Sequence, residues 1–287
     1  MGLSFRRLRR CQGDVRGQER GERLILDLSK PSVARMYDYL LGGTDNYEVD
    51  RDACGELLRL APSSRELALV NRAFLVRAVR YLAREHGVRR FLDSGSGLPT
   101  RPNVHQVAQE IDPASEVVYI DNDPVVLAHG RMMLAEDPST TAVLEADMRD
   151  TERIFGSPEV TRLLRDARPV AALFVSVLHC IPDGDDPWAL VRRVADKLPS
   201  GSYMVISQLA SDDAELRANI TDFMQNVTGG TWGQVRSVDR VDAFFDGLDL
   251  LEVDAPVEVS RWLPDNDLAP RQRTEEWIEY GAVARIR

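Results

Sequence analysis

The sequence predicts an α/β fold in which helices cover both faces of a mostly parallel sheet. Apolar stretches of strand length alternate with segments of helical periodicity through the last two thirds of the 287 residues. Three of these stretches end in an aspartate, at Asp93, Asp121 and Asp147. The glycine turn Gly95-Ser-Gly97 follows the first, which gives the order of strand, tight turn and helix that holds nucleotide-like ligands in such sheets.

Composition limits the classes of function. Hydrophobic residues make up 44% of the chain and charged residues 29%, as is usual for a globular protein. The net charge of -10 argues against nucleic acid as the main partner, because phosphate binding needs a basic face. The longest apolar run, residues 170–181, is too short to span a bilayer. Three cysteines without C-x-x-C spacing indicate neither a zinc site nor a disulfide framework, so we expect no metal and a cytoplasmic protein.

The chain divides unevenly by charge. Residues 1–30 carry a net charge of +4 and the remainder -14. The opening residues have no apolar core like that of a signal peptide. We expect residues 1–26 to be a disordered basic extension, with binding of an anionic partner as the alternative. Residues 27–287 are then a single domain, with a helical lid over 27–86 and a Rossmann-like core over 87–287.

Three helices are expected before the first strand. Apolar residues at helical spacing predict a helix over residues 32–41, which the pair Gly42-Gly43 ends. A second helix should follow Tyr47 and stop at Pro62. Residues 63–66 (SSRE) have the pattern of a capping box and open a third, long helix.

The remaining elements alternate between strand and helix. The glycine turn is followed by a helix near Asn103, and further helices are expected at 124–133, 188–198 and 211–247, the last with a glycine-rich break at 228–233. Seven strands are expected, one ending at Asp93 and the others at residues 117–121, 142–147, 170–176, 203–207, 248–253 and 280–286.

The strand ends carry the chemistry of the predicted ligand site. Asp121 lies 24 residues after Gly97, close to the offset of about 20 residues for an acid that grips a ribose. Each acid alone could be a solvated loop residue, but three in register with the glycine turn favour a ligand site. Pro99 and Pro102 interrupt a helix directly after the turn, and the third glycine of a dinucleotide fingerprint is missing. A phosphate-free ligand such as S-adenosylmethionine is therefore favoured over NAD, which weakens an NAD-dependent oxidoreductase as an alternative.

The chain resembles a family of S-adenosyl methyltransferases, first catalogued as a domain of unknown function and found mainly in actinobacteria. The match covers residues 27–287, departs from the family at Ser94, where an apolar residue is usual, and has no counterpart for residues 1–26. The resemblance is carried by residues 31–46 (PSVARMYDYLLGGTDN), 71–75 (NRAFL), 91–100 (FLDSGSGLPT), 103–108 (NVHQVA), 118–124 (VYIDNDP), 177–183 (VLHCIPD) and 244–247 (FFDG).

This resemblance implies a class I methyltransferase that uses S-adenosyl-L-methionine. Asp121 would hold the ribose hydroxyls, Asp147 and Met148 would flank the adenine, and Gly95 and Gly97 would admit the methionine portion. The N-terminal motif would fold over the pocket. Arg72 suits the methionine carboxylate, with a solvated helix face as its alternative. The other residues expected at the cofactor are Asp93, Asn122, Ser176, Tyr37, Gly43 and Asn46.

Methyl transfer requires mainly positioning and exclusion of water. A base is needed only if the acceptor must lose a proton early, and His179, with Asp183 nearby, is the candidate. The alternative for His179 is a hydrogen-bonded structural histidine in a buried turn. The leading hypothesis is methyl transfer to a small molecule, and the second is a non-catalytic S-adenosylmethionine sensor or interaction module. The sequence leaves the oligomeric state open.

Overall fold

A single sheet organises the computed structural model, which describes residues 28–134, 139–265 and 277–287. The sheet has eight strands in the order β3-β2-β1-β4-β5-β8-β6, and β7 pairs with β8 beside this path. The expected basic extension, residues 1–26, lies outside the described residues. The strands are β1 (Arg90–Ser94), β2 (Glu116–Asp121), β3 (Thr141–Glu145), β4 (Ala171–Val175), β5 (Tyr203–Ala210), β6 (Asp249–Leu250), β7 (Val257–Glu258) and β8 (Ile278–Arg285).

The direction of the last long strand determines which residues reach the ligand edge of the sheet. Strands β1 to β5 pair in parallel, whereas β8 runs antiparallel to β5 and β6. The first residues of β8 therefore meet the last residues of β5, with Ile278 opposite Ala210 and Glu279 opposite Leu209. The two-residue β7 was not predicted from the sequence, because so short a strand has no periodicity to detect.

Helices cover both faces of the sheet, which confirms the predicted fold class. On one face α3 (Ser64–Glu85) and α4 (Val104–Gln109) pack on alternate strand residues such as Phe91 and Leu173. The intervening residues, such as Leu92 and Phe174, form a second apolar cluster with helices of the other face. Those helices are α6 (Thr151–Phe155), α7 (Pro158–Leu163), α8 (Pro187–Lys197) and α10 (Val238–Asp242), with the short 3-10 helix η3 (Ala243–Phe245).

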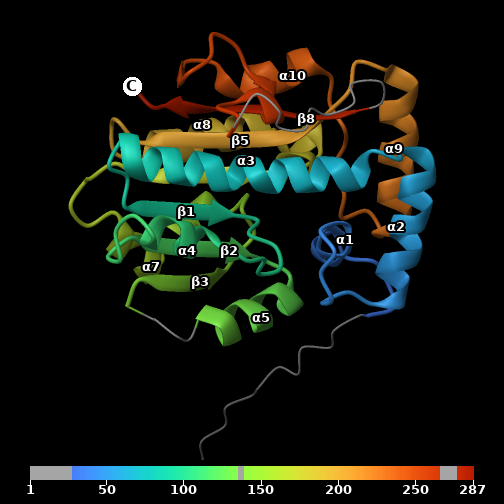
Figure 1. Cartoon of the computed structure of the whole chain (residues 1–287), viewed down its shortest axis with the longest axis horizontal. Coiled ribbons are helices and arrows are strands. Elements are labelled where there is room, and N and C mark those ends of the chain that lie inside the picture. The colour runs from blue at the N-terminus through green and yellow to red at the C-terminus, as the bar shows by residue number, and fades with distance from the viewer. Residues whose placement is uncertain (1–27, 135–138, 266–276) are drawn as a thin grey trace, which may run out of the picture.

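Three helices gather at one end of the sheet, where Figure 1 shows α1, α2 and α9 side by side. They are α1 (Val33–Leu40), α2 (Glu48–Leu60) and α9 (Ala214–Val227). Their apolar side chains form a core of their own together with the first turns of α3. The remaining helices are α5 (Pro124–Leu134), η1 (Leu178–Cys180), η2 (Asp183–Asp185) and η4 (Val259–Arg261). No helix within the described ranges is both long and apolar enough to cross a membrane.

The capping box predicted at the start of the third helix is wrong. Ser63 has helical dihedral angles (φ -76°, ψ -6°) and its side chain makes no cap hydrogen bond, whereas a capping residue needs extended backbone. A box forms instead at α4, where the backbone N–H of Asn103 donates to Oε1 of Gln106 at 2.8 Å.

We predict that Gly281→Ala destabilises the sheet at the contact between β8 and β5. A Cβ at Gly281 would lie 2.0 Å from the carbonyl oxygen of Ile206 and 2.7 Å from the Cα of Ser207, and backbone cannot move aside cheaply. The free energy of unfolding, measured by urea titration, should fall by about 2 kcal/mol or more.

The matched control is Gly55→Ala in the exposed face of α2, where an added Cβ meets nothing within 4 Å. Because alanine restricts the unfolded chain and favours helix, this variant should gain about 0.5–1 kcal/mol. Equal stability of the two variants would contradict the close approach of the two strands.

Candidate functional site

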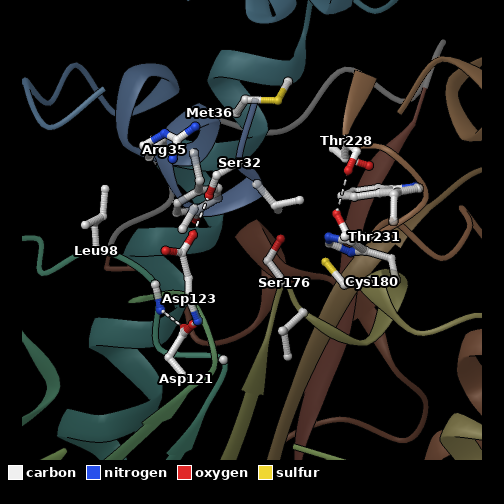
Figure 2. A pocket seen from close by; sticks show the side chains of 18 of the residues that line it. Ser32, Arg35, Met36, Leu98, Asp121, Asp123, Ser176, Cys180, Thr228 and Thr231 are labelled. Carbon is white, nitrogen blue, oxygen red and sulfur yellow. Dashed lines mark hydrogen bonds between the residues drawn. The ribbon is translucent and has the colours of Figure 1, made fainter. Parts of the chain in front are cut away.

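A cavity of about 750 Å³ lies between the carboxyl ends of the parallel strands and the helices gathered above them. Its volume is within the range of about 300–1,000 Å³ that is usual for small-ligand sites. Figure 2 shows the cavity from close by, with Ser176 between the side chains of Asp121 and Asp123 and those of Cys180 and Thr231.

Most of the residues predicted for the cofactor line this cavity. The structure brings together Asp93, Gly95, Gly97, Asp121, Asn122, Asp147, Met148, Ser176, Arg72 and Tyr37, and the candidate base His179 lines it too.

Gly43 and Asn46 do not line the cavity, although the sequence placed them at the cofactor. Both support Asp38, which does line it. A Cβ at Gly43 would lie 2.0 Å from a carboxylate oxygen of Asp38. The side-chain amide of Asn46 and the backbone N–H of Asp45 donate to Oδ2 of Asp38 at 2.8 and 2.9 Å. The motif therefore shapes the turn that holds one cavity residue.

The glycine turn is closed by the acid at the end of β2. Gly95 and Gly97 have φ of 68° and 65°, which glycine adopts without steric cost. The N–H of Gly97 donates to Oδ2 of Asp121 at 2.9 Å, and the N–H of Asp123 donates to Oδ1 at 2.9 Å. Burial raises the pKa of Asp121, although these backbone donors oppose the shift. Each carboxylate oxygen keeps a second lone pair for a ligand hydroxyl.

Arg72 joins the long helix α3 to the loop after the glycine turn. One guanidinium nitrogen, Nη2, donates to the carbonyl oxygens of Thr100 and Pro102. Its Nε is buried and has no hydrogen-bond partner among the described residues. An unpaired buried donor of this kind is suited to an anionic ligand group. Burial raises the pKa of Asp93 to about 7, and the positive charge of Arg72 opposes this rise.

Tyr37 and Asp147 have partners within the protein. The hydroxyl of Tyr37 donates to the carbonyl of Ala68 at 3.1 Å and accepts from the amide of Asn71 at 2.9 Å, which ties α1 to α3. Asp147 is half-buried, and the guanidinium of Arg149 donates hydrogen bonds to it. These bonds lower the pKa of the Asp147 carboxyl.

The environment of His179 fits a structural histidine better than a base. Its Nδ1 accepts from the backbone N–H of Leu209 at 3.4 Å, and its ring packs on Trp232 with centroids 4.6 Å apart. Burial lowers the pKa of His179 to about 3, aided by the charge of Arg236. With Nδ1 accepting, the ring proton is on Nε2, so the neutral ring offers no free lone pair. Asp183, expected beside it, pairs with Arg236 instead at 2.9 Å.

Glu279 is a cavity carboxyl that the sequence reasoning missed. It is 1% exposed, lines the cavity from β8 and accepts a hydrogen bond from the hydroxyl of Ser176 at 2.5 Å. Burial raises the pKa of Glu279 to about 8. Ser176 has φ of 56°, a left-handed conformation that is uncommon for a residue other than glycine. The sequence did not single out Glu279, because the strand expected there begins one residue later, at Tyr280. Within the residues that the structure describes, no group of three or more His, Cys, Asp or Glu side chains could hold a metal ion.

Comparison with known proteins gives a matching family, and two of the similar solved structures each cover 91% of this chain. The profile of the family described as S-adenosyl methyltransferase matches residues 19–287. A DUF574 family protein from Streptomyces avermitilis is 38% identical, with a TM-score of 0.81 over 91% of this chain and 99% of that one. A proposed methyltransferase from Thermobifida fusca is also 38% identical, with a TM-score of 0.83 over 91% and 97% of the two chains. No curated protein matches the sequence.

We predict that the free energy of unfolding of the ligand-free protein falls as the pH rises from about 5 to 8. In the unfolded chain Asp93 and Glu279 have the ordinary pKa values of their side chains, 3.8 and 4.5, but burial in the folded protein raises these pKa values to about 7 and 8. The folded state therefore binds more protons within this window, so stability is lost with rising pH. Urea titrations should show a slope on the order of 1 kcal/mol per pH unit.

The double variant Asp93→Asn, Glu279→Gln should flatten this slope, because neither replacement ionises. Asp166→Asn is the control, since Asp166 is a half-exposed carboxyl whose pKa is lowered by its hydrogen bond to Arg90 and is therefore ionised throughout the window. A slope that persists in the double variant would show that these two carboxyls do not cause it.

Proposed function

The chain belongs to the S-adenosyl methyltransferase family, and we propose that it methylates a small-molecule acceptor bound in the cavity beneath its N-terminal helices. It is an S-adenosylmethionine-dependent methyltransferase, with S-adenosyl-L-methionine as its cofactor. The proposal rests on one observation: the glycine turn, the strand-end acids and the helices α1 and α9 all line the same cavity. A space bounded in this way suits a small molecule rather than a macromolecular surface.

The side chains of the cavity fit the cofactor. When bound, S-adenosylmethionine supplies a methyl group activated by a sulfonium sulfur. We assign the ribose hydroxyls to the remaining lone pairs of Asp121, and the methionine carboxylate to the unpaired Nε of Arg72. Gly95 and Gly97 leave the backbone of the turn open to the methionine portion. Asp147 and Met148 are assigned to the adenine, and Asp93, Asn122 and Ser176 to the wall between these groups.

We also propose that residues 27–287 act as one domain in the cytoplasm. The helix α3 supports the first point, because Leu67 and Ala68 at its start pack in the core of the N-terminal helices while Phe74 packs on the sheet. The two cysteines within the described residues, Cys54 and Cys180, are free thiols, as is usual in a reducing compartment.

A second candidate is a sensor that binds S-adenosylmethionine without transferring its methyl group. The neutral, hydrogen-bonded state of His179 favours it, because the base expected from the sequence is not available. Formation of S-adenosylhomocysteine with cell extract as the source of acceptor distinguishes the two. Turnover supports the enzyme, and its absence in every extract supports the sensor.

We predict that S-adenosylmethionine binds with a dissociation constant in the micromolar range or below, and that Asp121→Ala weakens binding at least tenfold. The variant loses both the predicted ribose acceptor and the bond that closes the turn at Gly97. Calorimetry measures the affinity, and a loss of at least tenfold corresponds to about 1.4 kcal/mol or more.

Asp166→Ala is the matched control, because this aspartate pairs with Arg90 at the opposite end of β1 and should leave the affinity unchanged. Urea titration of both variants verifies that they are folded. Heat of binding with NAD and none with S-adenosylmethionine would contradict the assignment of the site.

A further inference from the structure

The cavity has two chemically different parts. One part is charged and carries Asp93, Asp121, Asp123, Asp147 and Arg72 around the glycine turn. The other, which we call the apolar part, is lined by buried side chains of one apolar cluster. They come from α1, α2, the end of β5, α9, the segment after α9 and the residue before β8. These are Met36, Leu57, Leu209, Met224, Trp232 and Trp277. In Figure 2 Asp121 and Asp123 lie on one side of Ser176, and Thr228 and Thr231 lie on the other.

The charged part already accounts for the cofactor, so the apolar part is left for the acceptor. Its walls include two indole rings, two thioethers and two leucines, which favour an apolar ring compound over a sugar or a charged metabolite. Methionine side chains adapt to the shape of such a ligand, while the indole rings offer flat surfaces for packing.

Glu279 is the carboxyl at the border of the apolar part. It follows Trp277 by two residues and pairs across the sheet with Leu209, and both of these belong to the apolar part. Its carboxylate accepts from Ser176, which directly follows β4 at the carboxyl edge of the sheet. The antiparallel direction of β8 therefore delivers a carboxyl to the place where the charged and apolar parts of the cavity meet.

On the basis of the function proposed above, we infer that Glu279 is the general base and that the acceptor is an apolar ring compound with a weakly acidic hydroxyl group, of the phenol class. A neutral amine can attack a methyl group through its lone pair before it loses a proton. A hydroxyl oxygen must give up its proton as the new bond forms, so a carboxyl beside the acceptor points to oxygen as the methylated atom.

The acceptor oxygen forms a bond to the methyl carbon while its proton passes to the carboxylate of Glu279. The bond between that carbon and the sulfonium sulfur breaks, and its electron pair stays on sulfur. The products are a methyl ether, S-adenosylhomocysteine and protonated Glu279, which returns its proton to solvent.

Four other titratable groups of the cavity can be separated from Glu279. Burial raises the pKa of Tyr37 far above neutrality and that of Cys180 to about 12, and it keeps His179 neutral, so none of these changes charge near pH 8. Burial raises the pKa of Asp93, in the charged part, to about 7 and that of Glu279 to about 8. A change of the methylation rate near pH 8 that is lost in the Glu279→Gln variant is therefore caused by ionisation of Glu279.

The test uses the full chain with S-adenosylmethionine and 1-naphthol, and measures S-adenosylhomocysteine and the methyl ether between pH 6 and 9. The rate should rise up to about tenfold per pH unit below pH 8. Glu279→Gln should lower kcat by about 100-fold or more and remove the rise in rate with pH below pH 8. Glu258→Gln is the matched control, because Glu258 is a buried carboxyl of the same sheet outside the cavity.

Binding provides a readout that does not depend on turnover. In calorimetry with the chain loaded with S-adenosylhomocysteine, 1-naphthol should bind and glucose should not. Glu279→Gln should keep the affinity for 1-naphthol within about threefold, because the apolar walls hold the ring. Calorimetry with S-adenosylmethionine verifies that the variant retains the cofactor site.

Each outcome separates the inference from the function on which it rests. Methylation of 1-naphthylamine but not 1-naphthol, or a Glu279→Gln variant with the native rate, overturns the inference. A chain that binds S-adenosylmethionine but methylates neither compound overturns the inferred acceptor class. A chain that does not bind S-adenosylmethionine overturns the proposed function itself.

Discussion

A continuous series of hydrogen bonds between the glycine turn and the N-terminal helices is the interaction on which the site depends. The N–H groups of Gly97 and Asp123 donate to the carboxylate of Asp121, and the hydroxyl of Ser32 donates to the carboxylate of Asp123. The N–H of Ser32 then donates to Asp50, which also forms a buried ion pair with Arg35. Buried carboxylates are costly unless such donors satisfy them. The hydrogen bonds that offset the cost of burying these carboxylates therefore also hold the N-terminal helices in place over the cavity.

The position of the cavity follows from the packing of one helix in two cores. The start of α3 packs with α1, α2 and α9, and the rest of it packs on the sheet. Because this helix cannot shift in one core without shifting in the other, the space between the two cores has a defined shape. That space encloses Asp93 and Glu279, whose pKa values burial raises to about 7 and 8. Burial of acids in a covered space is unfavourable for stability, and perturbed acids of this kind are typical of functional sites.

The parts of the site that follow directly from local sequence were predictable. The residues Asp93, Gly95, Gly97, Asp121 and Asp147 stand at the ends of apolar runs, and parallel strands bring those ends to one edge of the sheet. Gly43 and Asn46 were expected at the cavity because they belong to the motif of Tyr37. Their contact with Asp38 depends on how the turn after α1 folds back, which spacing along the chain does not reveal. His179 follows the strand end as expected, but its state depends on Leu209, Trp232 and Arg236, which come from distant segments.

The sequence alone determined the alternation of strands and helices, the open glycine turn, the acids beside it and the family to which these motifs belong. These features depend on hydrophobic periodicity and on the conformations open to glycine and proline, which act over a few residues. Only the tertiary structure decided which side chains share the cavity, that it is charged at one end and apolar at the other, and that Glu279 reaches it. The physical reason is that strand direction and burial are properties of the assembled sheet. The antiparallel pairing of β8 brings Glu279 to the ligand edge, and desolvation there sets its protonation.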